Sequence, residues 1–295
     1  FYAFNFQPSF DAQYEPENWQ KAVNNDAFRQ SIFWGLDRVK AMLVASGLEE
    51  SFVNGLTFVE ALPDFWSSRL FGKLEGEYGI VRSGTDPNAE YNPILYRKRR
   101  LELIEGGTHV YDYKDNPEKS KGFGWAVLRD KATGKTFVSY STHLWWKSKP
   151  LEKQPEYDRM RVNNVRELLA KMAELKRKYG GLPVIGGGDL NTTENIRLSG
   201  RDCPLNDWLK AGYCDAQYSV PGASPWSSNH GDPKRDALGF LRGYIRPEAG
   251  DPKNSLDHVH YTQATVTPLA LLVDRAQDAL ECSDHSPVIF TFTLK

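Results

Sequence analysis

The chain has 295 residues with 37 Lys and Arg against 38 Asp and Glu, which gives a formal net charge of -1 at pH 7. This length allows one large α/β domain or two small ones, and a hydrophobic content of 40% excludes a largely disordered chain. The near-zero charge provides no global field for a polyanion, whereas nonspecific nucleic-acid binders are usually more basic.

Cysteine content and hydropathy narrow the class further. Cys203, Cys214 and Cys282 are too few and too irregularly spaced for a disulfide framework or a zinc cluster, although one pair, Cys203 with Cys214, stays open. No apolar run approaches the ~18 residues of a membrane span, so we expect a soluble chain. Phe1 is not an initiator residue and already reads as part of a strand, so a removed leader, and with it secretion, stays open.

The first third of the chain predicts strands around one helix. FYAFNFQ (1–7) is aromatic and alternating, as in a strand, and contains Asn5. Residues 26–46 carry apolar side chains at helical spacing. LTFVEAL (56–62) predicts a second strand ending at Glu60. NPILYRK (92–98) and LELIEGG (101–107) predict a strand pair around a basic turn.

The remaining chain predicts a hairpin, a long helix and three later strands. GWAVLRD (124–130) and KTFVSYSTHL (135–144) are separated by KATGK, whose Gly134 suits a hairpin turn. The clearest helix runs from Asp158 to Tyr179 and ends at two glycines. The later strands are LPVIGGGDLN, SLDHVHYT and PVIFTFTL. Hairpins mixed with helices, and the lack of an evident linker, favour a mixed α/β sandwich in one domain, 1–295.

Polar residues lie where several of these strands end and loops begin. Catalytic and binding residues are often found at such positions. In GGGDLN, three glycines permit a tight turn and present Asp189 and Asn191 two residues apart. An Asx-rich turn that merely closes the strand is an equally good interpretation. STHLWW places His143 at a strand exit, where a capping or surface histidine is the common alternative.

Carboxylates also interrupt apolar segments. SDHSP puts Asp284, a candidate metal ligand, beside His285, a candidate donor to phosphate or water. Glu60 and Asp257 lie among strand residues in FVEAL and SLDHV. Burial of an unpaired carboxylate costs roughly several kcal/mol, so each should have a cation or a hydrogen-bond donor as partner. A structural salt bridge is the alternative for either one.

The order of these motifs resembles the endonuclease/exonuclease/phosphatase superfamily, the deoxyribonuclease-I-like fold. The seven motifs that carry the resemblance extend over nearly the whole chain: FNFQ, FVEAL, AEYNPILYR, STHL, GGDLN, SLDHV and SDHSP. The resemblance implies a four-layer α/β/β/α sandwich of two mixed β-sheets flanked by helices. It also implies a divalent-metal-dependent hydrolase acting on phosphoester bonds.

The resemblance further implies a metal centre and a water activator. Glu60 would be the principal Mg2+ ligand, with Asn5 and Asp284 as further ligands, and Mn2+ is an alternative ion. Asp189 would orient or deprotonate the attacking water, and Asn191 would bind the phosphate. Oxygen ligands of this kind suit a hard cation, which neutralises the charge that builds on phosphoryl oxygens.

Two carboxylate–histidine pairs complete the implied site. His143 would be held by Glu90, and His285 would be held by Asp257, and both imidazoles would donate to phosphoryl oxygens. Phosphoester hydrolysis mainly needs positioning and neutralisation of developing charge, which agrees with such an arrangement. The carboxylates would favour charged or correctly oriented imidazoles.

Substrate recognition is less strongly indicated. Trp145 and Trp146 follow His143 and would either stack on a substrate or belong to the core. The stretch 226–246 is long for a loop and carries aromatic and basic residues, among them His230 and Arg242, so we treat it as a recognition candidate.

We expect a monomer without a membrane span that acts on a phosphoester, with nucleic acid slightly favoured over phospholipid or a small phosphoester. A non-catalytic binding protein on the same fold is the alternative of another class. Such a protein would be expected to lose one of Asp189, Asn191, His143 or His285, and all four are present.

Overall fold

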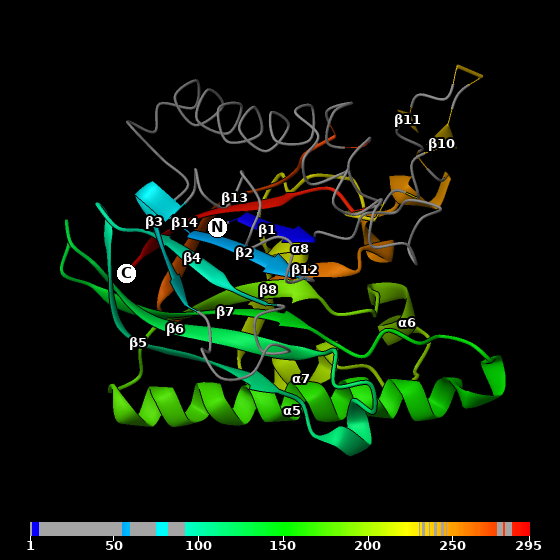
Figure 1. Ribbon diagram of the computed structural model, residues 1–295, viewed down its shortest axis with the longest axis horizontal. Helices are drawn as coiled ribbons and strands as arrows, with labels where there is room; N and C mark the ends of the chain where they lie inside the picture. Colours follow the sequence, from blue (N-terminus) through cyan, green and yellow to red (C-terminus); the bar gives the residue numbers. More distant parts are fainter. Residues whose placement is uncertain are drawn as a thin grey trace.

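Two six-stranded β-sheets pack face to face at the centre of the protein (Figure 1). The structure is a computed structural model. It describes residues 2–5, 55–59, 75–81, 92–229, 231, 234–235, 237–238, 241–242, 245, 247–275, 280 and 285–295. For residues 2–5, 55–59, 234–235 and 241–242 it describes the backbone alone.

The first sheet has the strand order β13-β14-β1-β2-β4-β3. Strands β1 and β2 run parallel, with Asn5 opposite Val59, and the other pairs run antiparallel, so the sheet is mixed. Its strands are β1 (Tyr2–Asn5), β2 (Gly55–Val59), β3 (Tyr78–Val81), β4 (Ile94–Arg97), β13 (Val266–Val273) and β14 (Val288–Leu294).

The second sheet has the order β5-β6-β7-β8-β12-β9 and is also mixed, because β7 and β8 are parallel among antiparallel pairs. Its strands are β5 (Leu101–Val110), β6 (Gly122–Asp130), β7 (Thr136–His143), β8 (Val184–Asp189), β9 (Tyr213–Asp215) and β12 (Asp257–Thr262). Strands β10 (Lys234–Arg235) and β11 (Leu241–Arg242) form a separate two-stranded ribbon.

Helix α5 (Gln154–Lys178) crosses the outer face of the second sheet, together with α7 (Figure 1). Its apolar stripe, which includes Val165, Leu168 and Met172, packs on the sheet in one buried cluster. Burial of each such side chain stabilises the fold by ~1.5–3 kcal/mol. The other helices named in the described part of the chain are short: α6 (Glu194–Leu198), α7 (Leu205–Lys210), α8 (Ala216–Ser219), η2 (Tyr113–Asp115), η3 (Leu151–Lys153), η4 (Pro247–Gly250) and η5 (Pro252–Asn254).

A second buried cluster fills the space between the sheets. It joins Ile94 of the first sheet to Phe137, Ile185 and Val259 of the second. Alternation along β7, β8 and β12 therefore sends every second side chain toward the first sheet and the others toward the helices. Within the described residues, no helix is long and apolar enough to cross a membrane.

These findings confirm the predicted mixed α/β sandwich of two mixed sheets, while the helix expected over 26–46 lies outside the described residues. The predicted pairing of 92–98 with 101–107 is wrong. Strand β4 pairs with β2 and β3, and β5 pairs with β6, so the basic turn between them carries the chain from one sheet to the other. Cys203 and Cys214 are free thiols and do not form the disulfide that the sequence left open.

Candidate active site

Three neighbouring strands of the second sheet place His143, Asp189 and Asp257 in one row. His143 lies opposite Asp189 in the parallel pair β7–β8, and Asp189 lies opposite Asp257 in the antiparallel pair β8–β12. Residues opposite each other point to the same face of a sheet. These three side chains share the face of Ile185 and Val259, so they project toward the first sheet at the end of the inter-sheet core.

The glycines before Asp189 allow this close arrangement. Gly188 has a φ of 150°, and a Cβ added there would lie 1.8 Å from the Thr142 carbonyl oxygen. Directly after the strand, the backbone N–H of Asn191 donates to Asp189 Oδ1 at 2.7 Å. The backbone φ of Asn191 is 47°. The Asx turn and the candidate site are therefore the same feature, since the turn fixes where both side chains point.

His143 is buried among polar neighbours. Its Nε2 lies 3.0 Å from Asn191 Nδ2 and 3.4 Å from Asp189 Oδ2. Burial lowers the pKa of His143 well below its ordinary value, and the positive charges of Lys121 and His285 add to this effect. Glu90, the expected partner of His143, lies outside the described residues.

Lys121 is a site residue that the sequence reasoning missed. Its Nζ lies 3.2 Å from Nδ1 of His143, and the residue is only 5% exposed. In the β6–β7 hairpin, Lys121 precedes Gly122, which lies opposite His143. A buried ammonium beside the site supplies positive charge toward an anionic group.

Asp257 and His285 form the predicted carboxylate–histidine contact, with His285 Nδ1 2.6 Å from Asp257 Oδ2. The Ser228 hydroxyl, which sequence reasoning also missed, donates to the same Oδ2 at 2.7 Å. Burial alone would raise the pKa of Asp257. The charge of His285 and hydrogen bonds from His285 and Ser228 outweigh it and hold that pKa below its ordinary value.

The pKa of Asp189 is shifted in the opposite direction from that of Asp257. Burial raises the pKa of Asp189 to about 7; the His285 charge opposes this shift, and the Asp257 carboxylate adds to it. A carboxyl group with a pKa near the operating pH is suited to take a proton from water. The row of carboxylates thus contains one member held as an anion and one that titrates near neutrality, a separation typical of acid–base sites.

The expected metal ligands are described only in part. Glu60 and Asp284 lie outside the described residues, and for Asn5 the structure gives the backbone alone. Asn5 is opposite Val59, the residue before Glu60, and β1 and β2 contact β8 across the sandwich. Within the described part of the chain, no group of three His, Cys, Asp or Glu side chains is arranged to hold a metal. The chemistry of the expected donor set, two carboxylates and an amide, fits a hard divalent cation.

The two tryptophans after His143 have different surroundings. Trp145 is 1% exposed and packs with Tyr157 and Met160, which favours the core position over substrate stacking, the two alternatives that the sequence left open. Trp146 is 48% exposed, and its indole N–H donates to Glu118 at 3.0 Å. Trp146 is therefore the exposed member of this pair, with Lys147 Nζ 5.5 Å from the centre of its ring.

The long loop was the other recognition candidate. His230 lies outside the described residues. Arg242 belongs to β11, where its backbone is opposite Lys234 of β10, and its side chain is not described. The segment therefore contains a two-stranded ribbon, which Figure 1 shows extending from the body of the protein.

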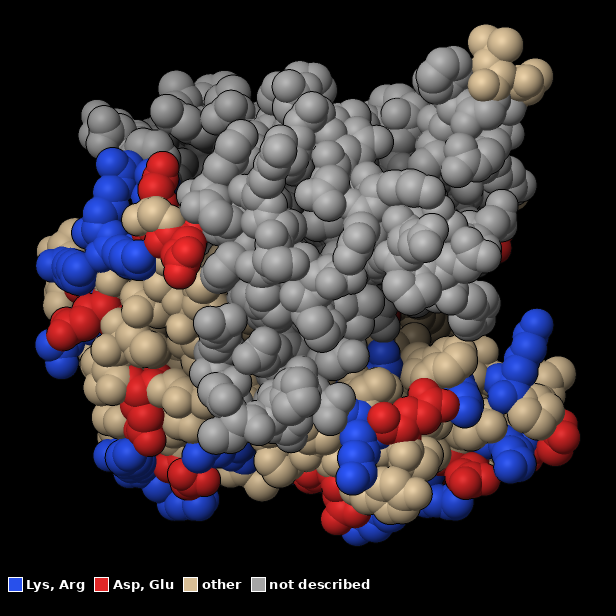
Figure 2. Space-filling view, in the orientation of Figure 1, with Lys and Arg blue, Asp and Glu red and all other residues tan. Residues whose placement is uncertain are grey.

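Basic side chains are mixed with acidic ones on the surface, as Figure 2 shows for the described part of one face. In the basic turn, Arg97 pairs with Glu77 at 3.0 Å and Arg100 pairs with Asp130 at 2.6 Å. Two of the four basic residues in this run are therefore paired with carboxylates.

Comparisons with solved structures identify the fold. An endonuclease/exonuclease/phosphatase protein from Bacteroides vulgatus has a TM-score of 0.62 at 19% identity, covering 100% of this chain and 98% of that one. TDP2 from D. rerio, complexed with a single-strand DNA product, has a TM-score of 0.58 at 15% identity, covering 99% and 98%. A mannosyl-6-phosphatase from Bacteroides thetaiotaomicron has a TM-score of 0.57 at 16% identity, covering 99% of each chain.

No protein-family model and no curated protein matches the sequence. At these identities the structural likeness establishes the fold, and the solved structures share it over almost their whole length. The fold inferred from the seven motifs, that of endonuclease/exonuclease/phosphatase proteins, is confirmed.

Proposed function

We propose that residues 1–295 form one catalytic domain of the endonuclease/exonuclease/phosphatase superfamily, a divalent-metal-dependent phosphodiesterase. The observation that carries the proposal is the row at the end of the inter-sheet core, where Asp189 lies between His143 and the Asp257–His285 pair. Nucleic acid is the substrate class we place first, ahead of a phospholipid or a small phosphoester.

In the proposed reaction, Asp189 takes a proton from water while the water oxygen forms a bond to phosphorus. The bond from phosphorus to the leaving oxygen breaks, the resulting alkoxide takes a proton from solvent water, and Asp189 returns its own proton to solvent. The amide of Asn191 binds a phosphoryl oxygen, and His143 and His285 donate hydrogen bonds as negative charge builds there. Donors held in place before the reaction lower the barrier, because they need no reorganisation.

Glu60, Asn5 and Asp284 are the residues that would hold Mg2+ or Mn2+, in agreement with their oxygen donors. A cation bound there would neutralise charge on the phosphoryl oxygens. Lys121, buried beside His143, adds a fixed positive charge on the side of the second sheet. A near-neutral protein can thus concentrate positive charge at the site without a basic surface.

A non-catalytic binding protein on the same fold is the rival proposal. It would not need a carboxyl group that titrates near neutrality beside a histidine, and burial of such a group opposes stability. Asp189 titrates near neutrality and lies beside His143. This observation favours the enzyme over the binding protein.

The test is hydrolysis of bis(p-nitrophenyl) phosphate with Mg2+ or Mn2+, before and after treatment with EDTA. We expect turnover only with metal, and a loss of ~10²-fold or more in Asp189→Ala and His285→Ala. His109→Ala is the matched control, because His109 pairs with Glu167 on the surface, with 48% of its side chain exposed.

Turnover that is indifferent to both variants would place the chemistry elsewhere. Absence of turnover on this substrate, on DNA, on RNA and on phospholipid, with metal bound, would favour the binding protein. If a substrate is cleaved, the rates on single-stranded DNA, RNA and phospholipid are compared. This comparison tests our proposal that nucleic acid is preferred over phospholipid.

A further inference from the structure

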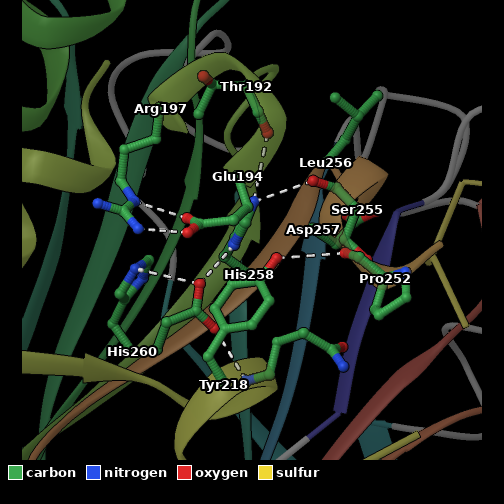
Figure 3. Close-up of polar contacts among 12 residues, drawn as sticks. Thr192, Glu194, Arg197, Tyr218, Pro252, Ser255, Leu256, Asp257, His258 and His260 are labelled. Carbon is green, nitrogen blue, oxygen red and sulfur yellow. Dashed lines mark hydrogen bonds and ion pairs between the residues drawn. The ribbon is translucent and has the colours of Figure 1, made fainter. Parts of the chain in front are cut away.

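A second histidine of β12, His258, lies directly behind the candidate site. It is 1% exposed and points toward the helices, on the opposite face from Asp257. Figure 3 shows its ring among main-chain oxygens of two loops and a carboxylate of the sheet. None of the roles described above uses this residue.

Every polar neighbour of the His258 ring is an acceptor. Nδ1 lies 2.7 Å from Oδ2 of Asp215, and Nε2 lies 3.2 Å from the Thr192 carbonyl oxygen and 3.0 Å from that of Ser255. A neutral imidazole has one N–H, so it would leave one of these contacts without a donor, whereas an imidazolium donates on both sides. Burial opposes the charge, yet Asp215 and the hydrogen bonds raise the pKa of His258 above its ordinary value.

The two carbonyl groups belong to the loops that carry the candidate catalytic residues. Thr192 follows Asn191 immediately, and Ser255 precedes Asp257 by two residues. The Ser255 hydroxyl accepts from the Ser228 backbone N–H at 3.2 Å, and Ser228 donates to Asp257 at 2.7 Å. His258 therefore connects the Asn191 loop to the hydrogen bonds that hold Asp257.

We propose that His258 is a positioning residue, whose imidazolium ties the Asn191 loop to the Asp257 loop by donating to Thr192 and Ser255. This inference rests on the proposed function, because the tie would serve catalysis at the candidate active site. The tie fixes the distance between the phosphate-binding amide and the Asp257–His285 pair. The two carbonyl oxygens share the single Nε2–H in a bifurcated contact, and the charge of an imidazolium makes this donor stronger than a neutral one.

His260 of the same strand offers a matched control. It faces the same side, stacks on Trp208 at 4.5 Å between ring centres, and lies 3.9 Å from Asp215. Burial lowers the pKa of His260 to about 3, so it is neutral, and its Nδ1 has no hydrogen-bond partner among the described residues. Substitution of His260 should disturb packing as much as substitution of His258, but without loss of the tie.

The experiment compares His258→Gln, Asp215→Asn and His260→Gln with the wild-type protein in steady-state hydrolysis with saturating Mg2+. In His258→Gln we expect kcat per folded molecule to decrease ~10–100-fold, as is typical for partners of catalytic ligands, with a smaller change in KM. Asp215→Asn should keep kcat within about fivefold, because an asparagine amide can donate to Nδ1 while Nε2–H still reaches both carbonyls. His260→Gln should keep kcat within about twofold, although its Tm falls.

Amide hydrogen exchange on the same proteins tests the tie without relying on activity. In His258→Gln, exchange should accelerate at residues 190–193 and 255–257 and not in the rest of β8 and β12, whereas His260→Gln should leave these loops unchanged. Equal effects of the two variants on the loops, or a kcat of His258→Gln equal to wild type, would overturn the inference. If the wild-type protein cleaves no phosphoester, the proposed function fails, and hydrogen exchange still decides whether His258 ties the loops.

Discussion

Nδ1 of His285 lies 2.6 Å from Oδ2 of Asp257, and the Ser228 hydroxyl donates to that same oxygen atom. Both side chains are at most 6% exposed, so neither can rotate freely into solvent. With Nδ1–H donating to the carboxylate, Nε2 is the ring atom that remains for a substrate. The contact therefore determines which nitrogen of His285 faces the reaction, in addition to stabilising its charge.

Asp257→Asn tests this relationship. The asparagine keeps the size of the side chain and removes the negative charge, so the imidazole loses its oriented, charge-assisted partner. We expect kcat to decrease by ~10²–10⁴-fold, the range typical of general acid–base groups, with a smaller change in KM. Asp112→Asn, on an exposed residue, is the control. A kcat within about twofold of wild type would show that Asp257 does not orient His285.

Asp189→Asn should separate activity from stability. The folded-state pKa of Asp189 is raised to about 7, above an unfolded value of roughly 3.9. The protonated carboxyl is favoured by the fold, so its contribution to stability is complete below pH ~3.9 and is lost as pH rises through about 7. Asparagine does not ionise, and the variant should be more stable than wild type at pH 8 but not at pH 3.5.

Thermal unfolding in EDTA at these two pH values measures the difference. We expect a Tm increase of ~2–8 °C at pH 8, which corresponds to a gain of about 1–2 kcal/mol, together with loss of activity. A lower Tm of the variant at pH 8 would mean that the buried carboxylate is well solvated or well paired in the folded state.

Gly188→Ala tests the close approach of β7 and β8. The new Cβ would lie 1.8 Å from the Thr142 carbonyl oxygen, and a φ of 150° is strained for any residue with a side chain. We expect a loss of more than ~4 kcal/mol of stability, or failure to fold. Gly76→Ala is the control, because nothing lies within 4 Å of its Cβ position, and its Tm should stay close to wild type. Equal stability of the two variants would contradict the strand geometry described above.

Much of the fold and the centre of the site could be predicted, because strand-end motifs record both the strand and the polar residue that follows it. Asp189 in GGGDLN and His143 in STHL are examples, and the register of β7 and β8 places them side by side. Short motifs of this kind do not indicate which distant strands pair with each other. The sequence therefore did not reveal that β4 and β5 lie in different sheets.

Residues missed by sequence reasoning act through contacts that only the folded chain creates. Lys121 precedes a glycine-rich strand with no motif of its own, and Ser228 lies in a serine-rich stretch that resembles an ordinary loop. His258 was adjacent to a recognised aspartate, but alternation sends it to the other face of the sheet. Two of its three partners, Asp215 and Thr192, come from segments distant in the sequence.

The adjacent pair Trp145 and Trp146 allows the substrate class to be tested with a built-in comparison. Trp145→Ala removes a buried ring and should destabilise the fold by ~3–5 kcal/mol. Trp146→Ala removes a ring that is 48% exposed, so the Tm should change little. If the substrate is single-stranded nucleic acid, loss of a stacking ring worth ~1–3 kcal/mol should raise KM at least ~fivefold, and Trp146→Phe should restore it. An unchanged KM for oligonucleotides would remove Trp146 from the substrate contacts, because an exposed indole that stacks on a base cannot be lost without weaker binding.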